Sequence, residues 1–236
     1  MASDNVANYP LTEQAYRTLR KAIVQCEFPP EERLRVDDLS ARYGFSSSPI
    51  REALTRLAEQ GLVLSIENRG FRVAPLSFDG LKDLTRVRLL IETEALKDAM
   101  ENGDDEWEER IVAAYHSLRL AEQRISEGPI ARDESWSERH RAFHLAIYSG
   151  CSSPLLLNLI DLLFDNAERY HRYSARFRKA RRKKDQDHQL IMKAALKRDK
   201  HAAVTLLKKH IRSTEQSVTK SVLAINNASW KMDISP

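Results

Sequence analysis

Histidine is the residue type whose spacing in this sequence points most directly to a specific chemistry. Four of the seven histidines fall on helical stripes that also carry apolar residues, so their side chains are expected to face the core. Neutral imidazole binds zinc, nickel and related ions well, whereas magnesium and calcium prefer oxygen ligands. The sequence therefore predicts a site for one divalent ion, zinc or nickel, held by His140, His144, His188 and His210.

The inward phasing of these histidines rests on their neighbours. His140 and His144 lie four residues apart, which places them on one face of a helix. His188 and His210 fall on the inner faces of two later helices. The apolar residues on these stripes are Trp136, Phe143, Ile147, Ile191, Ala195, Ala203 and Leu207. The histidines that lack such phasing, and are expected at the surface, are His116, His171 and His201.

The elements that must position these residues are helices. The chain contains only seven glycines and eight prolines, and it is rich in Leu, Ala, Arg and Glu, which favours a mainly α fold. From Asp79 onward the apolar periodicity predicts about six helices joined by short loops, which is typical of an antiparallel bundle. The expected ranges are 79–102, 105–127, 133–149, 154–177, 180–199 and 201–226.

The first 75 residues have a different pattern, that of a winged helix-turn-helix. Gly44 separates two short helices, and Pro49 follows a run of serines as a strong helix-start signal. Asn68-Arg69-Gly70 suits the tip of a β-hairpin placed directly after the second helix of this pair, which makes a wing. The expected helices are 11–26, 36–44 and 47–60, and the expected strands are 62–66 and 71–74.

The wing and the second short helix of this pair carry side chains that suit DNA. Such a helix enters the major groove with its N-terminal end against the bases, where serine hydroxyls and backbone amides can bind phosphates. Arg51 can form two hydrogen bonds with a guanine, and Arg69 can reach a phosphate or the minor groove. A helix-turn-helix used for protein contacts is the alternative, which these outward groups disfavour. The predicted DNA-contacting residues are Arg35, Ser46, Ser47, Ser48, Arg51, Arg56, Arg69 and Gly70.

Composition and charge limit the other classes of protein. With 42% hydrophobic residues the chain can bury a core, and its net charge of +4 permits a polyanionic partner without requiring one. The densest basic run, 169–184, is interpreted as a solvated helix face and linker. Cys26 and Cys151 lie far apart and are expected to be small core residues. Because neither a signal-peptide pattern nor a run of about 18 apolar residues occurs, we expect a cytoplasmic protein that does not enter the membrane.

Residues Gln14 to Leu76 resemble the GntR family of bacterial regulators. The resemblance is clearest over residues 46–57, Ser-Ser-Ser-Pro-Ile-Arg-Glu-Ala-Leu-Thr-Arg-Leu, followed by Gly61-Leu62 and Arg69-Gly70-Phe71. The family usually reads Ser-Arg-Thr-Pro-Val-Arg-Glu-Ala-Leu at the start of this stretch. Ser47 therefore stands where relatives carry an arginine that commonly contacts DNA, which implies a different operator.

The rest of the chain resembles the helical FCD effector domain of the FadR branch of that family. The matching stretches are 88–92, 140–144 and 187–191, together with His210. Relatives bind a divalent metal with one aspartate and three histidines, and the spacing from His144 to His188 to His210 matches theirs. His140 stands at the position of that aspartate. The resemblance thus implies a metal site in which one carboxylate is replaced by an imidazole.

This replacement bears on the effector. Four neutral imidazoles leave the full +2 charge on a bound ion, so the site should favour an anionic, chelating ligand such as a carboxylate. Alternatively, His140 abolishes metal binding and donates directly to that carboxylate. Arg88 matches a family arginine that often faces the ligand carboxylate, while a salt bridge with Glu92 is equally open. The predicted ligand-binding residues are therefore Arg88 and His140.

The expected function is that of a DNA-binding repressor released by a small carboxylate. A further resemblance, to the subgroup that governs carbon starvation and the use of glutarate or 4-aminobutyrate, implies a dicarboxylate. Residues 1–76 are expected to bind DNA and residues 77–236 to bind the effector and dimerise, because a homodimer matches a palindromic operator. The alternatives are a scaffold protein and a metalloenzyme built on the bundle. The metalloenzyme is disfavoured because no inward carboxylate accompanies the histidines as a general base.

Overall fold

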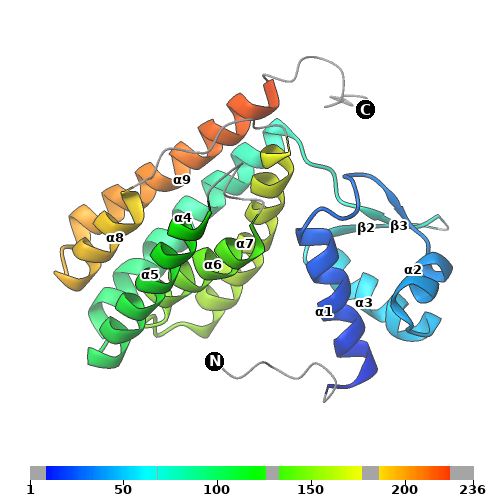
Figure 1. Ribbon diagram of the computed structural model, residues 1–236, viewed down its shortest axis with the longest axis horizontal. Helices are drawn as coiled ribbons and strands as arrows, with labels where there is room; N and C mark the ends of the chain where they lie inside the picture. Colours follow the sequence, from blue (N-terminus) through cyan, green and yellow to red (C-terminus); the bar gives the residue numbers. More distant parts are fainter. Residues whose placement is uncertain (1–8, 68, 126–132, 177–185, 224–236) are drawn as a thin grey trace. The chain divides into compact units, whose positions relative to one another are not determined.

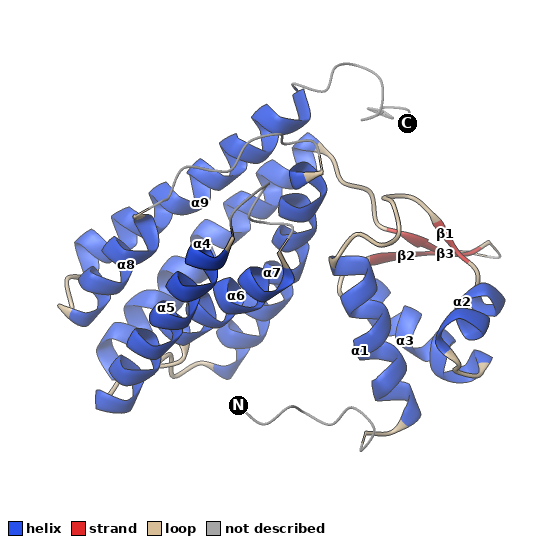
Figure 2. Ribbon diagram, viewed as in Figure 1, coloured by secondary structure: helices blue, strands red, loops and turns tan. Residues whose placement is uncertain are grey.

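The computed structural model divides the chain into two compact units, Met1–Leu76 and Ser77–Pro236. The structure describes residues 9–67, 69–125, 133–176 and 186–223. Each unit has a hydrophobic core of its own. Helices dominate both units, and the small sheet belongs to the first (Figure 2).

The first unit combines short helices with an antiparallel sheet (Figure 1). Strand β3 pairs with β1 on one side and with β2 on the other. Helix α1 packs on α3, and α3 packs on α2 and β2. The elements of this unit are α1 (Leu11–Val24), β1 (Arg33–Leu34), α2 (Val36–Tyr43), α3 (Ser47–Glu59), β2 (Val63–Ile66) and β3 (Gly70–Val73).

Two glycines set the turns around α3. Gly44 ends α2 with φ 74° and Gly61 follows α3 with φ 72°, a left-handed conformation that glycine adopts without steric cost. Ser46 is the N-cap residue of α3, although its side chain makes no capping hydrogen bond, and Pro49 lies in the first turn. These local signals produce the predicted helix-turn-helix, and β2 and β3 form the wing.

Strand β1 is a difference from the sequence-based expectation. Its two residues carry no periodicity, and its existence depends on pairing with β3, in which Arg33 lies opposite Arg72 and Leu34 opposite Phe71. At the predicted hairpin tip, Asn68 lies outside the described residues. Gly70 has φ 82°, as a tight hairpin requires.

The second unit is a helical bundle. Helix α4 packs on α6, α7 and α9, while α5 packs on α6 and α8, and α8 packs on α9. With the winged unit, this bundle confirms the predicted fold class. Among the described residues, no helix is apolar over a length that could cross a membrane. The helices are α4 (Phe78–Asn102), α5 (Asp105–Arg124), α6 (Glu134–Tyr148), α7 (Pro154–Ala175), α8 (Asp187–Leu196) and α9 (Lys200–Leu223).

Side-chain caps fix the starts of four of these helices. Ser77 caps α4, Asp104 caps α5, Asp133 caps α6 and Ser153 caps α7, each by accepting a hydrogen bond from a backbone N–H in the first turn. Such a cap satisfies an N–H that has no partner inside the helix, and its loss typically costs about 1 kcal/mol. This local chemistry explains why the predicted starts of these helices lie within a residue of the observed ones.

Other boundaries differ or fall outside the described residues. The helix expected over 180–199 is α8, which begins at Asp187, and residues 177–185 are not described. The expected ends at 127 and 226 also lie outside the described residues. The interpretation of the basic run 169–184 as a solvated face is wrong for Arg169, whose exposed fraction is 2%. Cys26 and Cys151 are buried, as predicted.

Arg198 ties the α8–α9 junction to the α4–α5 junction. It has φ 54°, and its guanidinium donates hydrogen bonds to the carbonyl oxygens of Met100 (3.0 Å) and Gly103 (2.9 Å). It also pairs with Glu108 Oε1 at 2.7 Å and lies 4.5 Å from the ring centre of Trp107. The carbonyls belong to the C-terminal end of α4, where a cation is favoured. One side chain thus links three helices.

Replacing Arg198 with alanine should lower the free energy of unfolding of the second unit by about 2 kcal/mol, because several hydrogen bonds are lost and their acceptors are left behind. Tryptophan fluorescence during urea denaturation reports this unit, since Trp107, Trp136 and Trp230 all lie beyond residue 76. Arg198→Lys keeps the charge without the forked geometry and should recover less than half of the loss. Equal stability of Arg198→Ala and the parent would contradict this role.

Candidate metal centre and nucleic-acid interface

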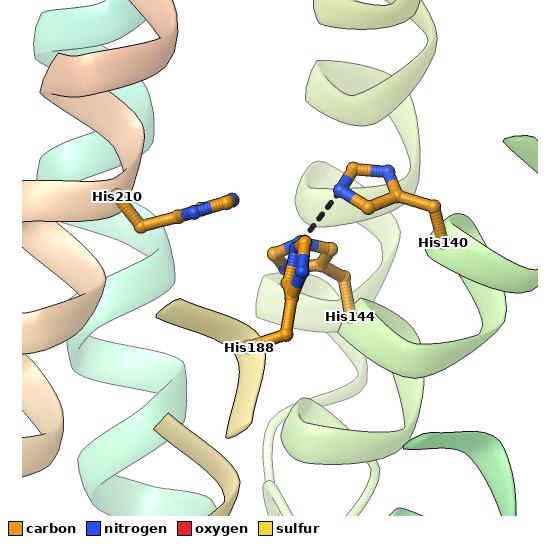
Figure 3. A group of neighbouring side chains, drawn as sticks. All are labelled: His140, His144, His188 and His210. Carbon is orange, nitrogen blue, oxygen red and sulfur yellow. Dashed lines mark hydrogen bonds between the residues drawn. The ribbon is translucent and has the colours of Figure 1, made fainter. Parts of the chain in front are cut away.

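Four imidazoles converge inside the helical unit. His140 and His144 project from α6, His188 from α8 and His210 from α9 (Figure 3). All four are buried, and one ring nitrogen from each lies within 4.8 Å of the others. The Nε2 atoms of His140 and His144 are 3.2 Å apart. Helices that are distant in sequence therefore bring together the four histidines that the helical phasing selected.

Aromatic rings surround the cluster. The indole of Trp136 stacks on His140, with ring centres 4.5 Å apart and planes 17° apart. Phe143 and Phe164 lie within 6 Å of the His144 ring. The ring centre of His171, on α7, is 6.4 Å from that of His140. The prediction that His171 lies at the surface is wrong, because its side chain is only 16% exposed and packs toward the cluster.

A carboxylate also lies close to one histidine of the cluster. Asp187 Oδ2 is 3.6 Å from His210 Nδ1, and Asp187 is buried at the start of α8. Elsewhere in the bundle the buried carboxylate of Glu92, on α4, accepts hydrogen bonds from Arg88 Nε at 2.5 Å and from the hydroxyl of Tyr148 at 2.7 Å. The expectation that no inward carboxylate accompanies the histidines is therefore wrong. Sequence periodicity could not place these groups against rings on other helices.

Of the two interpretations of Arg88, the structure shows the salt bridge. The four-residue spacing puts Arg88 and Glu92 on one face of α4, and both side chains are less than 10% exposed. Tyr148 completes the group from α6. The positive charge of Arg88 contributes to lowering the pKa of His144, so it acts on the cluster electrostatically. An incoming anion would have to compete with Glu92 for this guanidinium.

The histidines of α6 are neutral near pH 7. Burial, which penalises the charged form, is the main cause that holds the pKa of His140 and His144 well below the ordinary value of 6.5. The neighbouring imidazoles act in the same direction, because two adjacent rings cannot both be charged at low cost. A neutral imidazole carries the lone pair that a metal ion needs, so no proton has to be removed from these rings before binding.

The donor set fits zinc or nickel. Tetrahedral zinc with bonds of about 2.0 Å requires its nitrogen ligands to lie about 3.3 Å apart. The pair formed by His140 and His144 already meets this requirement at 3.2 Å, and the separations of up to 4.8 Å can close by small side-chain rotations. Among the described residues, the buried Nδ1 atoms of His140 and His144 make no hydrogen bond. The cluster is thus a set of imidazole nitrogens of the kind that binds these ions.

Helix α3 presents a polar face that suits DNA. Its buried face consists of Ile50, Ala53, Leu54 and Leu57, whose exposed fractions are all 0%. The opposite face consists of exposed polar side chains, and the helix start leaves backbone amides available there. The residues on this exposed face are Ser47, Ser48, Arg51 and Thr55.

The remaining predicted DNA-contacting residues differ in exposure and in their contacts with the rest of the unit. Arg35, Arg69 and Gly70 are exposed, as is Ser46. Arg56, in contrast, pairs with Glu13 at 2.9 Å and lies 3.8 Å from the ring centre of Tyr16, both on α1. A helix turns 100° per residue, so Arg56 points about 140° away from Arg51. We therefore give Arg56 a structural role between α1 and α3 and remove it from the DNA-contacting set.

Two family models match the chain. Residues 11–73 match the model of bacterial regulatory proteins of the gntR family. Residues 83–213 match the FCD domain model. The first match covers the helix-turn-helix and wing, and the second covers all four clustered histidines.

The curated relatives include transcriptional regulators that cover most of the chain. The uncharacterized HTH-type transcriptional regulator BphR of Paraburkholderia xenovorans is 36% identical over 204 residues, 86% of this chain and 83% of BphR. The HTH-type transcriptional repressor GlaR of Escherichia coli is 34% identical over 200 residues, 83% of this chain and 90% of GlaR. These relatives are regulators and not enzymes, in agreement with the sequence-based expectation.

Solved structures share the fold. That of Escherichia coli McbR/YncC has a TM-score of 0.72 and 22% sequence identity, and the match covers 92% of this chain and all of that chain. A structure described as a putative GntR regulator from Rhodococcus has a TM-score of 0.68 and 24% identity, covering 89% and 97% of the two chains. At this level of identity the likeness concerns the arrangement of helices and strands.

Proposed function

Because the chain belongs to the gntR family of bacterial regulatory proteins and carries an FCD domain, we propose that it is a transcriptional repressor that a small carboxylate releases from DNA. In this proposal the first unit binds operator DNA, and the second binds one zinc or nickel ion and, through it, the carboxylate. The observation that carries the proposal is the buried four-imidazole cluster inside the FCD domain. A bacterial DNA-binding unit joined to such a site is suited to sensing.

The DNA-binding half of the proposal rests on α3 and the wing. The exposed Ser47, Ser48 and Arg51 at the start of α3 can reach base edges and phosphates in the major groove. The exposed Arg69 can approach the backbone or the minor groove. A homodimer would present two such faces to the half-sites of a palindromic operator.

The effector half rests on the charge of the cluster. His140 and His144 are neutral, so a bound divalent ion would keep its +2 charge in a buried place and would attract an anion. A chelating dicarboxylate meets this demand and agrees with the subgroup resemblance of the sequence. Arg88 serves as a second anchor if the anion displaces Glu92 from it. The ligand releases DNA if it binds one arrangement of the two DNA-binding units better than the other.

The alternative in which His140 donates directly to a carboxylate has a distinct pH signature. Charged imidazoles would bind the anion best, and their number falls as the pH rises. Because the pKa of His140 lies well below 6.5, this loss of affinity would be complete below neutral pH. Metal-mediated binding at pH 7 needs no charged ring, which makes it the version that fits the buried cluster better.

The proposal is tested by DNA retention on genomic fragments. The full-length protein, purified without a histidine tag or chelator and loaded with zinc or nickel, should retain specific fragments in a gel-shift assay. A panel of small acids should then include at least one, expected among the dicarboxylates, that abolishes retention. Binding without sequence preference would contradict the operator-binding part of the proposal. Specific binding that no acid in the panel changes would contradict the ligand-responsive part.

Replacing Arg51 with alanine should weaken binding to the specific operator by roughly 1–3 kcal/mol, about 5- to 150-fold in Kd, if its guanidinium holds a guanine. Fluorescence anisotropy of a labelled operator measures this loss. Arg56→Ala is the matched control, because its side chain faces α1 and should not alter sequence preference. An unchanged operator Kd for Arg51→Ala would exclude the assigned contact.

Replacing Arg69 with alanine should weaken operator binding several-fold and reduce its salt dependence. Each phosphate contact contributes about 0.9 to the slope of log K against log salt concentration, so the slope should decrease in magnitude by about this amount. If Arg69 enters the minor groove instead, the loss should depend on the sequence beside the wing. Anisotropy titrations at several salt concentrations distinguish these cases, and identical slopes and affinities would rule out both.

A further inference from the structure

Asp187 lies beside the cluster without belonging to it. Its Oδ2 atom is 3.6 Å from Nδ1 of His210, across the packed pair α8 and α9. Its side chain is 11% exposed and that of His210 is 5% exposed. Lys209 Nζ lies 3.9 Å from the other carboxylate oxygen, and the Lys209 side chain is 69% exposed. The carboxylate therefore faces the buried ring on one side and a solvent-exposed ammonium on the other.

The two nitrogens of His210 have different surroundings. In Figure 3 the ring of His210 extends from α9 toward the other three histidines. Nδ1 is the nitrogen beside Asp187, which leaves Nε2 as the atom that a metal ion in the cluster can reach. A neutral imidazole carries one proton, so binding through Nε2 requires that the proton be on Nδ1. A buried N–H needs an acceptor, and the carboxylate of Asp187 is in place to serve as one.

From this geometry we infer that Asp187 is a positioning residue of the proposed metal centre: it holds the Nδ1 proton of His210 and aims Nε2 at the ion. The inference rests on the proposed metal site. The 3.6 Å separation exceeds a hydrogen bond by less than 1 Å, so a small rotation of either side chain closes it. Metal-bound histidines regularly donate their second N–H to a carboxylate, which fixes the ring and strengthens the ligand.

Asp187 also has a structural role that must be separated from this one. It stands in the first turn of α8, where a negative charge is favoured by the helix dipole. It directly precedes His188, so its loss could move a second ligand through the backbone. A change in metal affinity alone would therefore not show that Asp187 acts on the ion by positioning the ring of His210. A double-mutant cycle isolates this effect, because it measures the coupling between Asp187 and His210.

The experiment measures zinc affinity of the tag-free, full-length protein by competition with a chromophoric chelator. Asp187→Ala should weaken zinc binding about 10- to 100-fold. Asp187→Asn, which keeps an acceptor oxygen and nearly the same shape, should lose less. In a His210→Ala background, Asp187→Ala should change the remaining zinc affinity by less than about twofold, because no ring is left for it to position. Lys209→Ala should leave the affinity of the parent within about twofold.

Three outcomes overturn the inference. Unchanged zinc affinity in Asp187→Ala and Asp187→Asn shows that the carboxylate does not support the centre. An equal loss with and without His210 shows that Asp187 acts as a direct ligand or through α8. If the parent protein binds neither zinc nor nickel, the proposed metal site and this inference fail together, whereas the first two outcomes leave the metal site intact. Circular dichroism of each metal-free variant confirms folding, and His210→Gln replaces His210→Ala if the latter does not fold.

Discussion

Replacing His144 or His210 with alanine should remove the single divalent ion that we expect each chain to retain. Each variant loses one of four nitrogen ligands contributed by helices α6, α8 and α9. Removing an outer-shell partner of a metal ligand commonly costs 10- to 100-fold in affinity, so the loss of a ligand itself should exceed about 100-fold. Elemental analysis after dialysis should find about one ion per chain in the parent and almost none in the variants. Response to the carboxylate should disappear with the ion.

Operator binding by these variants is the control that separates sensing from folding. The winged unit has its own core and contains none of the four histidines, so specific DNA binding should persist. His201→Ala, at an exposed position on α9, should keep the ion and the response. A parent protein that contains no metal and takes up none on addition of zinc or nickel would contradict the prediction. Retention of the ion by both variants would do the same.

Lowering the pH from 7 to 5.5 should destabilise the metal-free protein. The folded-state pKa values of His140 and His144 lie well below 6.5, near which these groups titrate in the unfolded chain. Below pH 6.5 the unfolded chain thus binds more protons than the folded one, and stability is lost as the pH falls. The slope is up to about 1.4 kcal/mol per pH unit for each histidine.

Urea denaturation followed by tryptophan fluorescence at several pH values measures this effect. A His140→Gln/His144→Gln variant should have a much flatter profile between pH 7 and 5.5. The comparison with this variant matters because Glu168, whose pKa is raised by burial, changes stability in the opposite direction with pH. Zinc should restore stability at pH 6.5, since it binds only the neutral rings of the folded protein. Parallel profiles for the parent and the double variant would contradict the assignment of neutral buried rings.

Local rules determined the elements of this protein. The caps Ser77, Asp104 and Asp133 and the left-handed Gly44 and Gly61 act within a few residues of themselves, so the sequence could place most helix starts and the helix-turn-helix. Helical phasing could also predict which histidines face inward. Strand β1 escaped prediction because a two-residue strand has no period of its own and forms only against β3.

Tertiary packing decided which group each inward-facing side chain contacts. Helical phasing predicts that a side chain points inward. The group that it contacts there belongs to another helix, and no local sequence pattern determines how that helix is aligned with the first. For this reason the sequence alone could not decide between the two interpretations of Arg88. The structure decides it, because Arg88 donates a hydrogen bond to Glu92, which also accepts one from Tyr148. The sequence placed His171 at the surface and assigned no role to Asp187, because the His140 ring beside His171 and the His210 ring beside Asp187 belong to other helices.

The same limit applies to the DNA-binding face. Arg51 and Arg56 are both arginines of one amphipathic helix, and both were predicted to contact DNA. Only the packing of α1 against α3 shows that Arg56 is held by Glu13 and Tyr16. The sequence by itself therefore determined the fold class, the candidate metal ligands and the exposed start of the recognition helix, since each follows from periodicity and capping. The structure shows which of these side chains already contact other protein groups. Those contacts join elements far apart in the chain and arise only when the helices pack.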